Sequence, residues 1–351
     1  MPPDTFPIRK DANRCRDFAA VPDGATMYVT SGRTRVKAWA PAKLNLFLEV
    51  LGRRTDGFHE LDMLMLPIDL WDSLIAEPTE CGAIQLCAEW AAPPQRGDQE
   101  HPVQCGIGLL PKAEQNLVYK AFELVRATHC EPGGLKHGAR VRLWKRIPAE
   151  AGMGGGSSDA AAALVMANLI WKLELPFAEL ARLAAMLGSD VPFFLHSAAC
   201  VCRGRGEAVT PIGRRPSLFF VVLKPPMGLS TATVFRNTQL PSQPRSSSRI
   251  VAAMERGQPT QVGRLLFNRL QNAAVGQYEL IQRLASTFDR LDVVAHQMTG
   301  SGSCYFGLCR NAKHARCLAQ YLNSQDLGVA YAVRSANFPT PRRLTDQPSK
   351  N

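Results

Sequence analysis

A run of glycines, serines and alanines is the stretch of this sequence with the clearest chemistry. Residues 151–170 read AGMGGGSSDAAAALVMANLI, with four glycines between 152 and 156. Glycine lets backbone N–H groups approach an anion closely, and the alanine-rich part predicts a helix whose positive dipole end faces the loop. Ser157, Ser158 and Asp159 are candidate helix caps. The stretch predicts a phosphate-binding loop, with a plain glycine turn as the alternative.

Two common phosphate motifs do not fit this stretch. A P-loop needs Lys and then Ser or Thr after its last glycine, where this chain has Ser-Ser-Asp. The G-x-G-x-x-G spacing of dinucleotide sites is also missing from it. A different class of phosphate-binding protein is therefore indicated.

A lysine and an asparagine share one face of an apolar strand pattern. In PAKLNLFLEV, residues 41–50, Lys43 and Asn45 alternate with Leu44 and Leu46. Apolar neighbours place the ammonium near a cleft, where it could neutralise a phosphate or lower the pKa of a hydroxyl. An exposed strand lysine is the alternative.

A carboxylate and a second glycine loop complete the set of candidate residues. Asp190, in LGSDVPFFL, lies in apolar surroundings and needs a partner, for which Lys43 is the candidate. A turn or helix-capping role for Asp190 is equally open. MTGSGSCYF, residues 298–306, could offer N–H groups to an anion or form an ordinary hairpin turn.

The elements that must position these residues alternate between strand and helix patterns. Strands are predicted at 34–54, with a break into two at Pro41, and at 216–226 and 328–335. Helices are predicted at 114–130, 177–188, 260–272, 277–289 and 311–324. The strand, Gly-Ser turn, strand, helix and strand at the C-terminal end resemble a split β-α-β unit. The fold class predicted is α+β, in two domains.

Composition divides the chain into four parts. Residues 1–34 are polar and predicted to be a disordered extension, with Met27 as an alternative start. Residues 35–212 and 213–336 are predicted to be the two domains, and 337–351 a flexible tail. The polar segments 91–111 and 239–249 read as surface loops with no assigned role.

Charge and cysteine content narrow the class of protein. Of the net charge of +11, residues 1–37 contribute seven basic and four acidic side chains and 337–351 three and one, so the two tails carry +3 and +2. The sequence has no dense Lys/Arg run interleaved with aromatic residues, which would favour nucleic-acid binding. A basic surface around an anionic substrate explains the positive charge as well. The ten cysteines form no C-x-x-C pair and predict free thiols in the cytoplasm. No signal peptide or membrane span is expected.

Taken together, P-A-K-L-N, D-G-F-H, GGGSS, L-G-S-D-V-P and T-G-S-G resemble the GHMP family of small-molecule kinases over residues 35–336. The resemblance implies an N-terminal ATP-binding domain, a C-terminal split β-α-β domain and an active site in the cleft between them. Within the family, the resemblance is strongest to the members that use ATP and Mg²⁺ to phosphorylate the 2-hydroxyl of a cytidine diphosphate-linked methylerythritol. These members belong to the non-mevalonate isoprenoid pathway. Such a protein would be a monomer or homodimer acting on a small molecule, without nucleic acid or membrane.

The resemblance also implies roles for individual residues. Asp190 would be the base and Lys43 would orient the substrate and stabilise charge. Phe58 and Phe235 would sandwich the cytosine, with His59 reading its edge; tyrosine is common in the family where this chain has Phe58. Ser158 is the candidate Mg²⁺ contact. The ATP-binding set would be Asn116, Lys145, Gly152, Met153, Gly154, Gly155, Gly156, Ser157 and Ser158, and Asn45, Gly300, Ser301 and Gly302 would join the acceptor site.

Two other functions remain open from the sequence. One is a GHMP kinase for homoserine, mevalonate or a related alcohol, against which the D-G-F-H turn argues, because those acceptors carry no base to be read. The other is a basic nucleic-acid-binding protein, since a similar N-terminal fold occurs in ribosomal proteins. Such a protein would not require Asp190 or the GGGSS loop.

Overall fold

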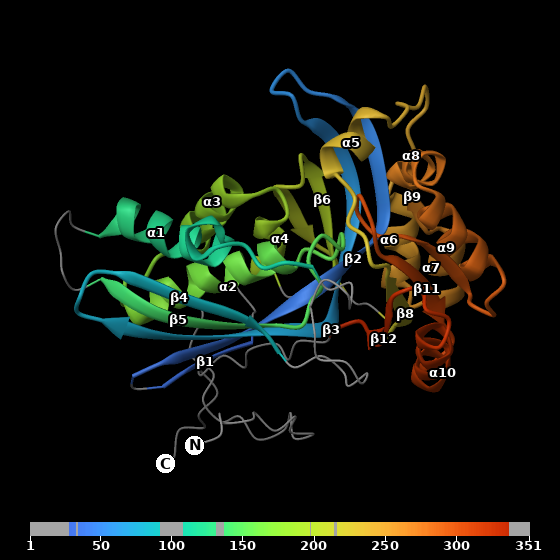
Figure 1. Cartoon of the computed structure of the whole chain (residues 1–351). Coiled ribbons are helices and arrows are strands. Elements are labelled where there is room, and N and C mark those ends of the chain that lie inside the picture. Colours follow the sequence, from blue (N-terminus) through green and yellow to red (C-terminus); the bar gives the residue numbers. More distant parts are fainter. Residues whose placement is uncertain are drawn as a thin grey trace, which may run out of the picture.

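The computed structural model describes residues 28–32, 34–91, 108–130, 137–196, 198–213 and 216–336 (Figure 1). Residues 1–27, most of the predicted surface loop 91–111 and the predicted tail 337–351 lie outside the described residues. The described chain forms two sheets with helices packed against them.

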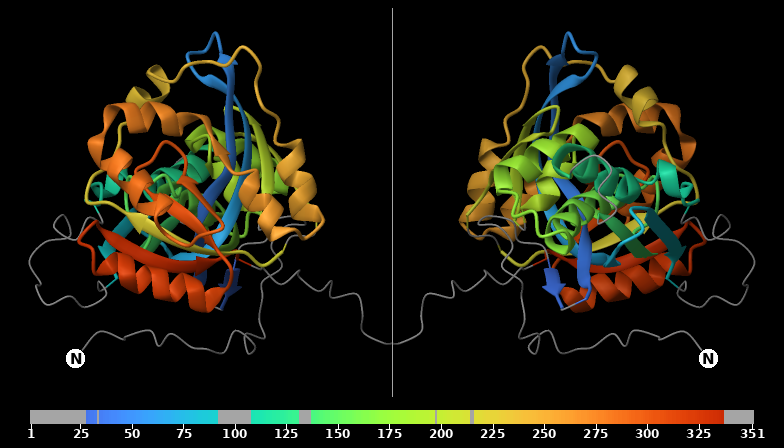
Figure 2. Two further views of the ribbon diagram at one scale, coloured as in Figure 1. Left: turned by 90° about the vertical axis from the view of Figure 1, so that its right-hand side faces the viewer. Right: turned by 90° about the vertical axis from the view of Figure 1, so that its left-hand side faces the viewer.

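A long antiparallel hairpin is the backbone of the first, eight-stranded sheet. It consists of β2 (Val36–Arg53) and β3 (His59–Thr79) and extends beyond the rest of the sheet at its tip (Figures 1 and 2). β1 (Tyr28–Ser31) pairs with β2, so the prediction of disorder for 1–34 is wrong for these four residues. Alternating side chains such as Val29 and Val36 are buried in the core, which explains the pairing.

Pro41 does not divide β2 into two strands as predicted. The strand continues through it, with a shift of register between Pro41 and Ala42. Such an irregularity accommodates a residue that cannot donate to the ladder and bends the strand locally. The bend comes two residues before Lys43, whose N–H donates to Met153 O at 2.9 Å outside the sheet.

The remaining strands of this sheet attach to different parts of the hairpin. β5 (Gly138–Lys145) pairs with the second half of β3, and β4 (Ile84–Trp90) lies parallel to β5. β6 (Cys200–Gly204) pairs with the first half of β3 and also with β7 (Ala208–Pro211). β9 (Phe267–Asn268), from the C-terminal half of the chain, lies parallel to β2.

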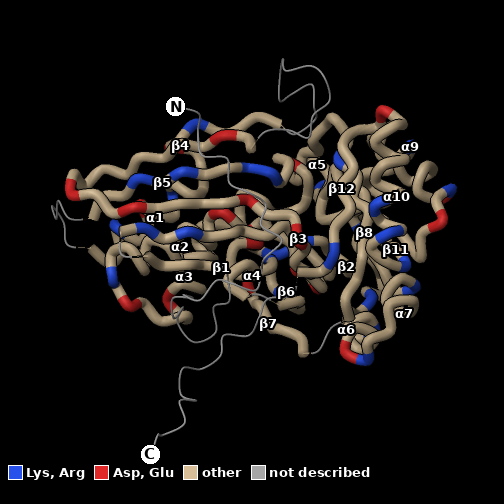
Figure 3. The backbone as a smooth tube through the Cα atoms, turned by 90° about the horizontal axis from the view of Figure 1, so that it is seen from below, with Lys and Arg blue, Asp and Glu red and all other residues tan. Residues whose placement is uncertain are grey.

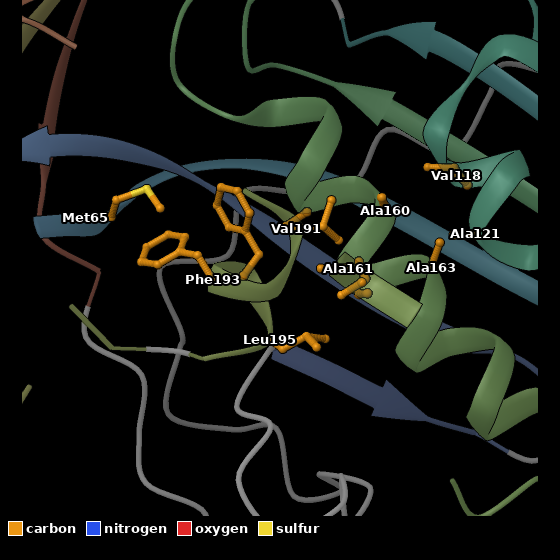
Figure 4. Close-up of a cluster of buried hydrophobic side chains, with 14 of the residues drawn as sticks. Met65, Val118, Ala121, Ala160, Ala161, Ala163, Val191, Phe193 and Leu195 are labelled. Carbon is orange, nitrogen blue, oxygen red and sulfur yellow. The ribbon is translucent and has the colours of Figure 1, made fainter. Parts of the chain in front are cut away.

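Helix α2 (Gly155–Ile170) is the centre of the helical layer on this sheet. Its residues from Ala160 to Ala167 are buried on all sides, since small alanines let neighbouring elements approach closely. Figure 4 shows Ala160, Ala161 and Ala163 within one apolar cluster, with Val191 and Phe193 on one side of them and Ala121 on the other. Around α2 lie α1 (Leu117–His129), α3 (Phe177–Leu187) and α4 (Val191–Leu195), and the short helix η1 (Ala113–Gln115) packs on α1 and β4.

The second sheet has four strands in the order β10-β11-β8-β12, all antiparallel. These are β8 (Phe219–Lys224), β10 (Ala295–Met298), β11 (Tyr305–Cys309) and β12 (Val329–Arg334). α10 (Ala312–Asn323) connects β11 to β12, and β8 is inserted between these two parallel strands. This confirms the predicted split β-α-β unit.

The other C-terminal helices differ from the prediction at several places: the first two were not predicted, and the second begins at Ser248, inside the predicted surface loop 239–249. They are α5 (Thr231–Arg236), α6 (Ser248–Glu255), α7 (Pro259–Arg264), α8 (Arg269–Gln277) and α9 (Glu279–Asp289). The single helix predicted at 260–272 is wrong, because β9 separates α7 from α8. Pairing of β9 with β2 outweighs the local helical preference there.

Several predictions from composition can be compared with the described residues. The eight cysteines among them are all free thiols, as predicted. In these parts of the chain, no helix has both the length and the apolar character needed to cross a bilayer. Basic and acidic residues are interspersed over both halves of the molecule when it is seen from below (Figure 3).

A buried carboxylate on the hairpin joins it to the C-terminal half. Glu49, completely buried in β2, accepts hydrogen bonds from Arg269 Nε and Nη2 at 2.7 and 2.8 Å. It also accepts from the N–H of Arg245 at 2.9 Å, within the segment 239–249. Burial alone would raise the pKa of Glu49, but the hydrogen bonds from Arg269, Arg245 and Val50 lower it below its ordinary value of 4.5.

We expect Glu49→Gln to lower the free energy of unfolding by about 2–3 kcal/mol at pH 7, less than for a fully buried pair because Arg269 is partly exposed. The folded-state pKa lies below the unfolded one, so the stabilisation is present above pH 4.5 and is lost as the pH falls through the folded-state pKa. Urea unfolding of both proteins between pH 7 and pH 3 should show the difference shrinking with acidity. Glu255→Gln, at an exposed position on α6, is the control; a difference that does not change with pH would contradict this role.

Candidate active site

Lys43 lies buried at the base of a cavity, with its ammonium beside two side chains. Its Nζ donates to Asn45 Oδ1, two residues along the same face of β2, as the strand alternation predicts. The same Nζ lies 3.5 Å from Asp190 Oδ2. The predicted partnership of Lys43 and Asp190 is therefore present.

Asp190 is placed differently from the sequence expectation. It precedes α4 and follows α3, and its side chain is 32% exposed. The carboxylate faces the cavity instead of being enclosed by the apolar residues that follow it, since Val191, Phe193 and Leu195 turn into the core. An open carboxylate next to a buried ammonium can accept a proton from a molecule bound in the cavity.

The first glycine loop, residues 151–154, ends at the N-terminus of α2. Gly154 is the helix N-cap with φ of 70°, and no side chain caps the helix. The predicted caps Ser157, Ser158 and Asp159 lie inside α2 instead. The free N–H groups of the first turn and the positive dipole end therefore remain available to an anion.

The second glycine loop, residues 299–304, meets the first one backbone to backbone. A Cβ on Gly152 would lie 2.3 Å from Thr299 O and 2.9 Å from Gly302 O. A Cβ on Gly300 would lie 3.1 Å from Gly152 O and 3.4 Å from Lys43 Nζ. Gly152 and Gly300 also have φ of 69° and 57°, which favour glycine. Only glycines allow this close approach beside the ammonium.

Polar side chains from distant parts of the chain fix the second glycine loop. Thr299 Oγ1 accepts from the N–H of Asn45 at 3.0 Å. Asn268 donates to Met298 O at 2.8 Å and to Gly300 O at 2.9 Å, while its Oδ1 caps α8. Gln297 donates to Asn45 O at 2.8 Å. Sequence reasoning missed Asn268 and Gln297, for which no local motif exists.

Three aromatic rings lie around the mouth of the cavity. The rings of His59 and Phe235 are in contact, with centroids 5.0 Å apart and planes tilted by 30°. Phe58 is 47% exposed and has Arg205 over its ring at 5.0 Å. Burial and the Arg53 charge lower the pKa of His59 below its ordinary value, so its ring is neutral at pH 7. No further ring fits between His59 and Phe235 as they stand.

The cavity has a volume of about 1170 Å³, enough for a nucleotide-sized ligand. It brings together most of the residues singled out in the sequence. Those that line it are Lys43, Asn45, Phe58, His59, Gly152, Gly154, Ser157, Asp190, Phe235, Gly300, Ser301 and Gly302. Sequence reasoning missed other lining residues, among them Arg53, Glu150, Arg205, Thr231 and Arg236.

Six predicted nucleotide-binding residues do not line this cavity: Asn116, Lys145, Met153, Gly155, Gly156 and Ser158. Asn116 accepts from the N–H of Val118 and caps α1. Ser158 is completely buried, and its Oγ has no hydrogen-bond partner among the described residues. Met153 is buried in the core, whereas Gly155 and Gly156 form the first turn of α2.

The predicted place of Lys145 in an adenine pocket is not supported by its surroundings. Its ammonium is buried between the carboxylates of Asp72 and Asp159, with Asp159 Oδ2 at 2.6 Å. These two carboxylates raise the pKa of Lys145 despite its burial, whereas burial raises the pKa of Asp159 above its ordinary value. A Cβ on Gly155 would lie 3.1 Å from this ammonium. Lys145 thus packs against the first turn of α2 and pairs with Asp159 of that helix.

Comparison with known proteins gives one consistent result. Models of the GHMP kinases N terminal domain and GHMP kinases C terminal families match residues 116–198 and 250–326. The chain is 38% identical over 286 residues to a 4-diphosphocytidyl-2-C-methyl-D-erythritol kinase of Pelotomaculum thermopropionicum, which covers 81% of this chain and 92% of the relative.

Solved structures agree with the sequence relatives. A crystal structure of 4-(cytidine 5'-diphospho)-2C-methyl-D-erythritol kinase superposes with a TM-score of 0.67 at 32% identity, over 86% of this chain and all of that one. A homoserine kinase from Cytophaga hutchinsonii superposes with a TM-score of 0.64 at 17% identity, over 89% and 97% of the two chains. The second likeness concerns the fold alone.

We expect Gly152→Ala to destabilise the protein by roughly 2–4 kcal/mol, because an added Cβ meets Thr299 O and the positive φ is unfavourable for alanine. Separation of the two glycine loops should also weaken ATP binding. Thermal unfolding and ATP titration measure the two effects. Gly276→Ala is the matched control, since its Cβ would meet nothing within 4 Å in helix α8; equal stability of the two variants would contradict the proposed contact.

Proposed function

The chain belongs to the 4-diphosphocytidyl-2-C-methyl-D-erythritol kinases of the GHMP kinase family, and we propose that it transfers the γ-phosphate of ATP to the 2-hydroxyl of 4-diphosphocytidyl-2-C-methyl-D-erythritol. This reaction belongs to the non-mevalonate route to isoprenoid precursors. The observation that carries the proposal is the pairing of Lys43 and Asp190, 3.5 Å apart, at the place where the two glycine loops meet.

Asp190 is the proposed base. Its carboxylate is open to the cavity and accepts the proton of the acceptor hydroxyl as that oxygen attacks the γ-phosphorus. The O–H bond breaks, the new O–P bond forms, and the bond from the γ-phosphorus to the bridging oxygen of ADP breaks. Phosphoryl transfer depends mainly on positioning and charge stabilisation, so a part-exposed carboxylate beside a buried ammonium suffices.

Lys43 holds the acceptor oxygen and the transferred phosphoryl group. Its ammonium is fixed by Asn45 and Asp190 and lies close to Gly300 on the second loop. A buried positive charge at this position stabilises the negative charge that develops during transfer. Asn45 keeps the ammonium on this side of β2 and is the proposed acceptor contact.

The first glycine loop and the first turn of α2 are proposed to hold the phosphates of ATP. Gly152 and Gly154 have positive φ, and a side chain on Gly154 would meet the Phe194 ring at 2.8 Å. The loop therefore presents bare backbone to the cavity, which fits an anion held by N–H groups. ATP, when bound, would supply the phosphoryl group, with ADP as the leaving group.

Mg²⁺ fits this site as a companion of the nucleotide. No group of three or more His, Cys, Asp or Glu side chains in the described ranges could hold a metal ion alone. Mg²⁺ commonly binds through phosphate oxygens, water and one or two protein oxygens. Ser157, which lines the cavity, is a better placed contact than the fully buried Ser158. The ion would neutralise phosphate charge.

The cytidine end of the acceptor is proposed to bind at the aromatic mouth. Phe58, His59 and Phe235 lie there, and a neutral His59 can both donate to and accept from a base edge. Because His59 and Phe235 already touch, the base would lie between this pair and Phe58. Homoserine and mevalonate carry no nucleobase that these rings could bind. The rings therefore favour the cytidine-linked acceptor.

Phosphate transfer to 4-diphosphocytidyl-2-C-methyl-D-erythritol, with the product identified by ³¹P NMR, tests the proposal directly. We expect Asp190→Asn to lower kcat by ~10²–10⁴ with little change in the KM for ATP, because the base is removed and the shape kept. Lys43→Ala should cost a similar factor. Asp292→Asn, at an exposed ion pair with Arg310, is the control. Turnover near that of the wild type in either variant, or phosphorylation of homoserine or mevalonate instead, would contradict the assignment.

We expect Phe58→Ala to raise the KM for the cytidine-linked acceptor by roughly 5- to 150-fold, since one base–aromatic stack contributes about 1–3 kcal/mol. The KM for ATP should change little. Phe58→Tyr keeps the ring and should be close to neutral. Steady-state kinetics with each substrate varied in turn measure both values. A rise confined to the KM for ATP would show that Phe58 belongs to the nucleotide-donor side of the cavity.

A further inference from the structure

Three arginines line the mouth of the cavity without forming an ion pair among the described residues. They are Arg53 at the end of β2, Arg205 in the turn after β6 and Arg236 at the end of α5. Among the described residues, none of the three lies within 4.0 Å of a carboxylate oxygen in an ion pair, whereas the neighbouring Arg54 pairs with both Asp56 and Glu60. Unpaired guanidinium groups gathered at one cavity favour an anionic ligand.

Each of these arginines lies next to one of the three aromatic residues. Arg53 is opposite His59 in the β2–β3 register, and its charge lowers the pKa of that ring together with burial. Arg205 lies over Phe58 with its guanidinium carbon 5.0 Å from the ring centroid. Arg236 follows Phe235 in α5. A ligand whose base contacts the rings would place its phosphates within reach of guanidinium groups.

Contacts between the elements keep the arginines together. Arg53 Nη2 donates to Arg236 O at 3.4 Å, joining the hairpin tip to α5, which lies beside it in Figure 1. Arg205 Nη2 donates to Ala185 O at 2.8 Å. Each guanidinium carries five N–H donors, so most of them remain free for a ligand. The arginines are thus partly positioned before any ligand binds.

The carboxylates nearby do not neutralise this side of the cavity. Glu207 accepts from the backbone N–H of Arg205, and Asp190 is paired with Lys43 at the base of the cavity. Asp56 also feels the charge of Arg205, but its carboxylate accepts from the N–H of Phe58 at 3.1 Å and pairs with Arg54. Glu150, the other acidic residue lining the cavity, comes directly before the first glycine loop and touches Gly228. The mouth therefore carries a surplus of positive charge.

We propose that Arg53, Arg205 and Arg236 bind the diphosphate of a nucleoside diphosphate-linked acceptor, while the aromatic rings bind its base. The inference rests on the proposed function. It adds the diphosphate, between the base and the hydroxyl end of the acceptor, as the group that the arginines bind. Guanidinium groups match phosphate oxygens in planar, bidentate pairs, and such charge-assisted hydrogen bonds are stronger than neutral ones. The diphosphate holds the acceptor in line, with its base outward and its hydroxyl toward Lys43.

Calorimetric titration with CDP, CMP and cytidine separates the phosphate contribution from that of the base. We expect Arg205→Gln, Arg53→Gln and Arg236→Gln each to weaken CDP binding by about 5- to 30-fold and cytidine binding by less than about twofold. Added salt should weaken CDP binding by the wild type more than by the triple variant. All three residues are at least partly exposed, so melting temperatures should not change.

Two further variants sharpen this test. Arg203→Gln removes a 63% exposed arginine two residues from Arg205 that does not line the cavity, and it should leave CDP binding unchanged. Arg205→Lys keeps the charge but not the flat fork and should bind CDP with intermediate affinity. Equal losses for CDP and cytidine would overturn the inference, because the arginines would then support only the rings. A wild type that binds neither CDP nor cytidine would instead contradict the proposed function.

Discussion

The close backbone contact between the two glycine loops is the constraint on which the site depends. Gly152 lies just before the helical layer of the first sheet and Thr299 in the connection between two strands of the second sheet, yet a Cβ added to Gly152 would lie only 2.3 Å from Thr299 O. Lys43 lies at this junction and donates its backbone N–H to Met153 O. Any change in the relative position of the two sheets would move the loops apart and displace the ammonium. The rigidity of the site therefore comes from the packing of both halves, more than from the loops themselves.

Two lysines near α2 illustrate how surroundings assign roles to identical side chains. Lys145 is buried between Asp72 and Asp159 beside the start of α2, and its charge is paired with these two carboxylates. Lys43 has one carboxylate partner that is itself open to the cavity. Burial with two acids makes a structural cation, because breaking such a cluster leaves an uncompensated charge. Burial beside an open acid leaves an ammonium that a bound phosphate can share. The sequence shows both lysines in similar strand patterns, so only the tertiary structure separates them.

The parts of the site that could be predicted are those carried by local patterns. Strand alternation placed Lys43 and Asn45 together, and the glycine-serine stretches placed both loops. The helix cap was wrong because glycine, in a positive φ that serine would resist, ends the loop before Ser157 is reached. Glu49 with Arg269 and Asn268 with Gly300 could not be predicted, since their partners lie 220 and 32 residues away without any motif. The helix at 260–272 failed for the same reason: β9 is defined by β2 and not by its own residues.

Residues at the bottom of the cavity are held more firmly than residues at its mouth. The proposed catalytic residues lie at the bottom, and the proposed residues for acceptor recognition lie at the mouth. Lys43 and Asn45 are 3% and 1% exposed and are tied to backbone and side chains of both halves. Phe58 is 47% exposed at the tip of a hairpin that extends beyond the sheet, with a single cation–π contact over its ring. Ordering exposed side chains costs free energy when a ligand binds. Buried side chains at the bottom of the cavity are already ordered, so the reaction does not incur that cost. A substrate that engages the mouth with both its base and its phosphates offsets the ordering cost, and one that lacks either does not. On the proposed assignment, selection of the acceptor occurs at the mouth, and the chemistry that follows depends on the buried Lys43 and Asn45.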